Sequence, residues 1–185
     1  MALPHSRSYT LRKTDRKTTI LRPVGQPDSA PPAFSIETHS MSKPNVIAFR
    51  GPPHSSAPIG DARFHSFSSS VDVTVRGQPV HMKMSQLSGS FSIESPRGQK
   101  MKWHLSQSTG SSWTLRDASG ANLAQLKSHG IPGLGGEKRL DILVPCDEGL
   151  VELIVVTGLA AVTLHKQIKQ AAEGGGDAVS ALVGA

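Results

Sequence analysis

The segment DEGLVELIVVTGLAAVTLHKQIK, residues 147–169, contains the longest apolar run of the chain and decides the fold. A helix that crosses a bilayer needs about 20 consecutive, predominantly apolar residues. The run from Gly149 to Leu164 is shorter, and it carries a carboxylate at Glu152. We therefore expect no transmembrane span, so these apolar residues must be buried within the protein.

The same segment has the flanking residues of a helix. The β-branched residues 154–156 would also suit a strand, but the run is too long for one strand. Asp147 is a good N-cap residue, and Lys166 and Lys169 lie where cations stabilise the end of a helix. The sequence predicts a helix over about 148–168.

Apolar side chains surround this predicted helix on almost every side. One side carries Leu150, Leu153, Ile154, Gly158 and Ala161, and much of the remainder carries Val151, Val155, Leu159 and Val162. A helix that is apolar nearly all round must be enclosed nearly all round. The rest of the chain has to supply that enclosure.

Upstream of the helix, apolar and polar residues alternate with the period of two that is typical of strands with one buried face. The clearest hairpin joins residues 71–75 to residues 80–84. Two more hairpins follow, the second with a turn at 117–120. The remaining strand patterns lie at 9–12, 18–22, 34–37, 46–50, 63–67 and 140–144.

The predicted strands number about ten to twelve, with the short connections of an antiparallel meander. Sheets of this size curl into a barrel or split into a sandwich. Because a helix must be enclosed, we expect a mainly β protein, a closed antiparallel barrel around a hydrophobic C-terminal helix. One domain would span residues 9–170, between flexible segments at 1–8 and 171–185.

This order of elements resembles the tubby C-terminal-like superfamily, which includes LURP-one-related proteins and phospholipid scramblases. The resemblance rests on KWHLSQSTGSSWTLRDASGANLAQL at 102–126, then LDILVP at 140–145 and LVELIVVTGLAAVTL at 150–164. It covers about Val71 to Ile168 and looks closest to small stand-alone fungal members. It implies a barrel closed around its helix, and a phosphoinositide-binding function for some relatives.

The cysteine content and the N-terminal residues indicate in which cellular compartment the protein is located. A single cysteine, Cys146, excludes an intramolecular disulfide and a multi-cysteine zinc site. Residues 1–17 lack the apolar core of a secretory signal. We expect a cytoplasmic protein that can associate peripherally with membranes.

Motifs of enzymes and metal sites are missing from the sequence. The glycine-rich residues 130–138 lack the Gly-Lys-Ser/Thr of a phosphate-binding loop, and no base partner for Cys146 is recognisable. We expect no enzymatic activity, no cofactor and no metal. The histidines are scattered without paired metal-ligand spacing: His5, His39, His54, His65, His81, His104, His129 and His165.

Glu152 is the one carboxylate inside the apolar run. A lone buried charge is very costly, so an enclosed Glu152 must be paired or hydrogen-bonded. A structural ion pair near the barrel mouth is the favoured interpretation. The alternative is an interior site at which the protein carries a small ligand or catalyses a reaction.

Positive charge is concentrated near the N-terminus. The net charge is +6, and residues 1–50 hold eight Lys/Arg against three Asp/Glu. Such a segment attracts anionic phospholipid or nucleic acid, but it lacks the interleaved aromatics of nucleic-acid readers. The predicted function is therefore a binding or adaptor module that contacts anionic membranes through Arg12, Lys13, Arg16, Lys17 and Arg22.

Overall fold

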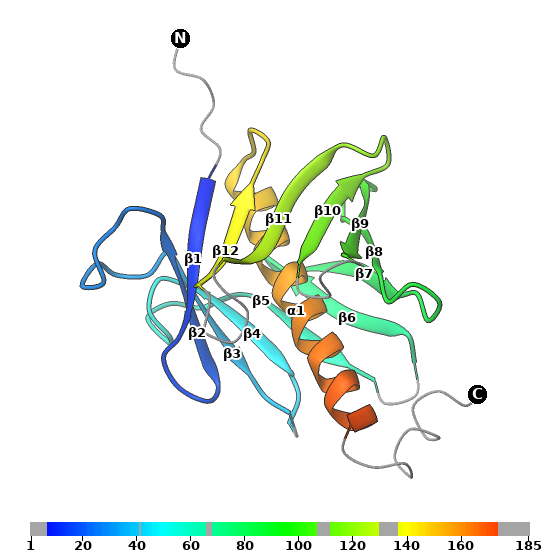
Figure 1. The fold of residues 1–185 in the computed structure, drawn as a ribbon, viewed down its shortest axis with the longest axis horizontal. Coiled ribbons are helices and arrows are strands. Elements are labelled where there is room, and N and C mark those ends of the chain that lie inside the picture. Colours follow the sequence, from blue (N-terminus) through cyan, green and yellow to red (C-terminus); the bar gives the residue numbers. More distant parts are fainter. Residues whose placement is uncertain (1–6, 41, 66–67, 107–111, 130–136, 174–185) are drawn as a thin grey trace.

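The chain forms a ring of antiparallel strands with a helix running through it (Figure 1). This computed structural model describes residues 7–40, 42–65, 68–106, 112–129 and 137–173. Each strand pairs with its neighbours in sequence, and β1 pairs with β12 to close the ring. The predicted closed barrel around a C-terminal helix is confirmed. The elements are β1 (Arg7–Lys13), β2 (Thr18–Pro23), β3 (Phe34–Thr38), β4 (Val46–Arg50), β5 (Pro58–Phe64), β6 (Ser70–Val75), β7 (Gln78–Met84), β8 (Phe91–Glu94), β9 (Lys100–Leu105), β10 (Trp113–Asp117), β11 (Asn122–His129), β12 (Glu137–Ile142) and α1 (Glu148–Glu173).

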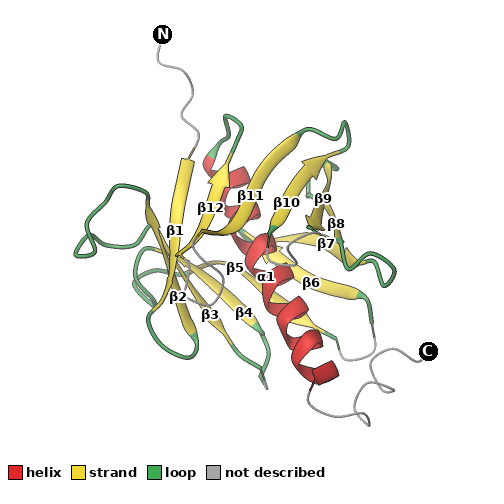
Figure 2. Cartoon of the chain, in the orientation of Figure 1, coloured by secondary structure: helices red, strands yellow, loops and turns green. Residues whose placement is uncertain are grey.

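The helix gives the barrel two distinct ends. At the Glu152 end, α1 begins beside the end of β4 and the β6–β7 turn. Strand pairing places the β2–β3 and β4–β5 connections at the same end. At the Lys13 end lie the β1–β2, β3–β4 and β7–β8 connections. The last turns of α1 emerge at this second end (Figure 2). The two ends therefore present different parts of the same helix.

The alternation in the sequence decides which face of each strand is buried. On β6, Val71, Val73 and Val75 point into the barrel and are at most 7% exposed, whereas Asp72 faces outward. β7, β8 and β10 alternate in the same way. The inward faces together form one hydrophobic core with the helix.

The helix begins and ends for different reasons. The Asp147 carboxylate accepts a hydrogen bond from the Leu150 N–H at 2.8 Å, which satisfies a backbone donor of the first turn. Residues 151–161 are buried on every side. The helix continues to Glu173, five residues beyond the predicted end. Its last turns are rich in helix-forming residues, and Lys169 lies 3.8 Å from Glu173 one turn away.

Close contact between the helix and the barrel wall depends on Gly158. A Cβ atom at this position would lie 2.9 Å from Cζ2 of Trp103, which is fully buried on β9. The Trp103 indole N–H also donates to the Thr157 hydroxyl at 3.1 Å. The tryptophan therefore fixes both the depth and the rotation of the helix.

Long-range pairing of the first and last strands closes the barrel. Thr10 on β1 lies opposite Arg139 on β12 and opposite Arg22 on β2. Outside the barrel, the Ser8 hydroxyl donates to Asp141 at 2.6 Å, and Arg139 Nε donates to the same carboxylate at 2.6 Å. This polar cluster supports the pairing on its solvent side.

The segments predicted to be flexible lie mostly outside the described residues, at 1–6 and 174–185. Arg7 and Ser8 already belong to β1, and residues 171–173 belong to α1. The glycine-rich stretch at 130–138 also falls largely outside the described part of the chain. β1 thus begins at Arg7, two residues before the predicted start of the domain.

Candidate functional site

A buried carboxylate lies between two arginines at the Glu152 end of the barrel. Glu152 is in the second turn of α1, and its side chain is 2% exposed. Arg50, the last residue of β4, bonds to Oε1, and Arg76 Nε bonds to Oε2. Both oxygens therefore have a cationic partner, as the cost of burying a charge requires.

The ion pairs of Glu152 belong to a longer chain of alternating charges across the barrel mouth. Arg50 also donates to Glu148 Oε2 at 3.0 Å, and Arg7 of β1 bonds to Glu148 Oε1. The Arg50 guanidinium lies 5.6 Å from the centroid of the Phe34 ring. We call Arg7, Glu148, Arg50, Glu152 and Arg76 the mouth cluster. It joins the start of the helix to three separate parts of the barrel wall.

The mouth cluster keeps its acids ionised. Burial on its own would raise the pKa of Glu152, but hydrogen bonds from Arg76 and Arg50 outweigh it and the pKa is lowered. The hydrogen bond from Arg7 likewise lowers the pKa of Glu148. A carboxylate held ionised between arginines is a poor proton donor. This geometry suits anchoring of the helix better than acid catalysis.

Arg76 occupies an unusual backbone position. The two-residue turn between β6 and β7 has positive φ at both Arg76 (51°) and Gly77 (72°), the geometry of a type I′ hairpin. Glycine, asparagine and aspartate are the residues that tolerate this conformation best. The ion pair with Glu152 offsets the strain of placing an arginine there.

A hollow opens beside the mouth cluster. It has a volume of about 610 Å³, with Leu150 and Leu153 of the helix forming part of its wall. Arg97 stands at its edge, 3.8 Å from Asp147. This hollow is close to Glu152, the candidate for an interior site, but it is not lined by Glu152, whose oxygens bond to the two arginines.

The five predicted lipid-binding cations do not gather in one place. Arg12 and Arg22 both lie beside Asp28, at 2.8 Å and 3.6 Å, and Arg22 Nε also donates to the Ala30 carbonyl. These two arginines hold the β2–β3 loop against the outside of the barrel. Their charge is therefore partly neutralised within the protein.

The other three lie at the Lys13 end. Asp15 accepts hydrogen bonds from the N–H groups of Lys17 and Thr18 at 2.7 and 2.8 Å, which shapes the β1–β2 turn around Arg16. Lys13 ends β1 immediately before this turn. All three cationic side chains are exposed to solvent.

Two cations from distant parts of the sequence join this group. Lys138 of β12 lies opposite Leu11, two residues from Lys13 on β1, and its side chain is exposed. Partial desolvation and repulsion from Lys166 and Lys13 lower the pKa of Lys138. No local pattern in the sequence predicts this proximity, because Lys138 is on β12 and Lys166 is on the helix. We call Lys13, Arg16, Lys17, Lys138 and Lys166 the cationic end.

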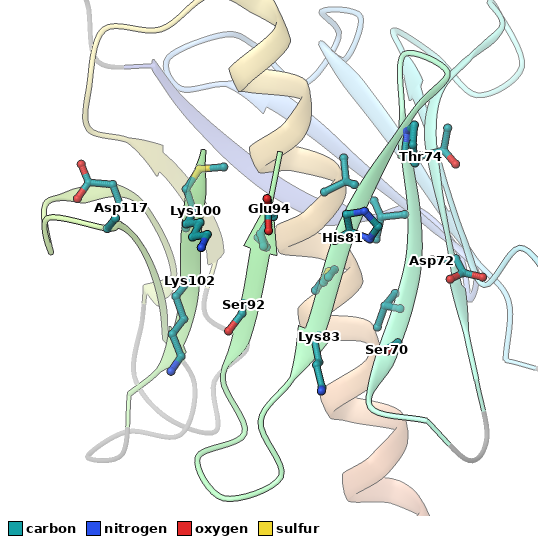
Figure 3. A pocket seen from close by; sticks show the side chains of 18 of the residues that line it. Ser70, Asp72, Thr74, His81, Lys83, Ser92, Glu94, Lys100, Lys102 and Asp117 are labelled. Atoms are coloured by element: carbon teal, nitrogen blue, oxygen red, sulfur yellow. The ribbon is translucent and has the colours of Figure 1, made fainter. Parts of the chain in front are cut away.

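A second hollow, of about 820 Å³, lies against strands β6–β9 (Figure 3). The outward side chains on its wall include Lys83, Ser92 and Lys102 toward the Lys13 end, with Glu94 and Lys100 toward the Glu152 end. We call this the outer groove. These residues lie on the outward faces of their strands, and the sequence pattern did not single them out.

The described residues offer little support for a metal site or for a reactive cysteine. Within the described part of the chain, no three His, Cys, Asp or Glu residues lie close enough to hold a metal ion. Burial raises the pKa of the Cys146 thiol, which makes the reactive thiolate less available. Burial also lowers the pKa of His165, whose ring packs edge-on against Trp113.

Comparison with known proteins adds no assignment: no family model, curated protein or solved structure matches the chain. By length and composition, α1 is one helix that could cross a membrane. However, 61% of its most apolar window is buried inside the barrel, and the core helix of a soluble protein meets the same criteria. The apolar residues thus have an enclosure within the chain itself.

Proposed function

We propose that this chain is a non-enzymatic binding module of the tubby-like type that attaches peripherally, from the cytoplasm, to anionic phospholipid surfaces. The cationic end is the contact surface. The observation that carries this proposal is the gathering of cations from three elements: β-strand pairing sets Lys138 of β12 beside the end of β1 that carries Lys13, and Lys166 of α1 is close enough to repel Lys138. The order of strands and helix supports the tubby-like assignment, although a fold by itself does not fix a function.

The chemistry of the cationic end fits a membrane surface. Each Lys or Arg close to an anionic bilayer contributes about 1 kcal/mol of attraction, which salt weakens. Cations that repel one another in the free protein gain most from an anionic partner. Interior catalysis or ligand carriage around Glu152 has weaker support, because both of its oxygens are already paired.

Sedimentation with vesicles tests the proposal. Wild-type protein should bind vesicles containing phosphatidylserine at low ionic strength and release them as salt is raised. Replacing Lys13, Lys17 and Lys138 with Gln should weaken binding more than tenfold, because about 1 kcal/mol is lost per cation.

A matched variant controls for net charge. Replacing Lys83, Lys100 and Lys102 of the outer groove with Gln removes the same charge elsewhere on the molecule. This variant should keep most of the vesicle binding. Failure of the wild-type protein to bind at low salt, or equal losses in the two variants, would refute the proposal.

A further inference from the structure

Strand register arranges the outer groove into two rows of side chains. The row nearer the Glu152 end runs Asp72, His81, Glu94 and Lys100 across β6–β9. The row nearer the Lys13 end runs Ser70, Lys83, Ser92 and Lys102, and it continues onto β10 at Arg116. Residues in one row lie on neighbouring strands, about 5 Å apart.

The first row is balanced in charge. Asp72 accepts a hydrogen bond from His65 at 2.8 Å, provided that the imidazole nitrogen carries the proton. Glu94 is directly opposite Lys100 on one side and His81 on the other. Each carboxylate of this row therefore has a basic neighbour.

The second row is not balanced. Its charged residues are all cations: Lys83, Lys102 and Arg116. None of the three forms an ion pair with any residue that the structure describes. Lys102 lies directly opposite Arg116. Like charges in that position destabilise a sheet. The cations also act on His104, whose pKa is lowered by burial and by repulsion from Lys102 and Arg116.

We propose that the outer groove is a docking site for an extended acidic peptide segment of another protein, with its carboxylates over Lys83 and Lys102 in the groove and over Arg116 on the adjoining strand β10. Lys83 and Lys102 are two strands apart, roughly 10 Å. An extended peptide covers that distance in about three residues. The hydroxyl of Ser92 lies between Lys83 and Lys102, and that of Ser70 lies beyond Lys83, so both can donate hydrogen bonds to the peptide.

Other anions fit this surface less well. A flat bilayer cannot enter a concave groove on the side of the barrel, and its counterpart is the cationic end. The residues that line the groove include no Phe, Tyr or Trp, the side chains on which nucleic-acid readers most often stack bases. A single phosphate would meet at most two of three cations spread across four strands. Separated negative charges on a flexible chain match the row best.

Peptide binding tests the docking site independently of the membrane proposal. The probe is a fluorescein-labelled decapeptide with Glu at every third position and Ser elsewhere, which matches the spacing of Lys83 and Lys102. Its binding is measured by fluorescence anisotropy at low salt against the same peptide with Gln in place of Glu. We expect salt-sensitive binding of the Glu peptide alone. The Lys83→Gln/Lys102→Gln variant should bind it at least tenfold more weakly, and an unchanged thermal melt would show that it is folded.

The Lys13→Gln/Lys17→Gln variant is the control, because it removes the same charge from the cationic end. It should keep peptide binding while losing vesicle binding, so the two proposals can fail separately. Absence of peptide binding, equal losses in both variants, or equal binding of the Gln peptide would overturn the docking site. Loss of vesicle binding in the groove variant, displacement of the peptide by millimolar inorganic phosphate, or stronger binding of single-stranded DNA by the groove would also overturn it.

Discussion

At the scale of single residues, the helix comes close to the barrel wall at Gly158, which has no side chain to hold the two apart. Gly158 faces the fully buried ring of Trp103, and a Cβ atom there would be too close to the indole. The sequence predicted that Gly158 is buried, because it lies on the apolar side of the helix. It did not identify the facing residue, because β9 is more than 50 residues away.

Replacing Gly158 with Leu should lower the free energy of unfolding by about 1–3 kcal/mol, because the new side chain overpacks the core against Trp103. The measurement is urea denaturation followed by tryptophan fluorescence. Ala172→Leu, on the exposed last turn of the same helix, is the control and should change stability by less than about 0.5 kcal/mol. Equal stabilities of the two variants would show that the close approach does not exist.

Replacing Glu152 with Gln should destabilise the fold by about 3 kcal/mol at neutral pH, because breaking a buried ion pair leaves groups without a partner. This value is at the low end of the usual cost of breaking a buried ion pair, because the Arg50 and Arg76 side chains are about half-exposed and water can solvate them instead. The control is Glu173→Gln, which removes only an exposed pair with Lys169. A Glu152 variant as stable as this control would contradict the anchoring role.

The mouth cluster also predicts how stability depends on pH. The pKa values of Glu148 and Glu152 are lowered in the folded state, so their contribution is complete above the unfolded value of about 4.5. That contribution is lost as pH falls below this value toward the folded pKa values. Unfolding free energies measured between pH 7 and pH 3 should therefore fall more steeply for the wild type than for Glu152→Gln. Parallel curves would show that the acid is not held ionised.

At the scale of elements, the sequence was informative wherever one face of a strand is buried. The hairpin of β6 and β7 was predicted because Val71, Val73 and Val80 alternate with polar residues, and all three are buried. The turn after β10 was predicted from Asp117 and Gly120, and Gly120 has the positive φ that such a turn requires. Local periodicity thus specified most elements.

The end of the helix was less accessible to sequence reasoning. The apolar pattern stops near the end of the enclosed segment, and the helix continues to Glu173 through residues that favour a helix without being buried. The partners of Glu152 were also missed, because Arg50 and Arg76 belong to separate hairpins. Side-chain pairing between distant elements leaves no periodic signal in the sequence.

At the scale of the whole molecule, the barrel depends on the pairing of β1 with β12, which are separated by more than 120 residues. Sequence patterns favoured a closed barrel only indirectly, through the need to enclose an apolar helix. They could not give the registration of Thr10 with Arg139. The same limit applies to the cationic end, which exists only once strand β12 and the helix are in place.

Replacing Thr10 with Pro should disrupt this closure, since proline fixes φ and removes a backbone donor from a strand paired on both sides. Amide hydrogen exchange should then accelerate along β1 and β12 before it does so in β6 and β7. Thr10→Ala keeps the donor and should leave the exchange pattern close to the wild type. Unchanged protection of β12 in the proline variant would show that β1 does not close the barrel.

The position of α1 after all twelve strands has a consequence for biosynthesis. A ribosome releases the strands first, and their inward apolar faces have nothing to pack against until the helix emerges. Contacts between residues far apart in sequence form slowly, and exposed apolar strands aggregate. The nascent barrel is therefore expected to need chaperone protection until Ala161, the last fully buried residue of the helix, has emerged from the ribosome.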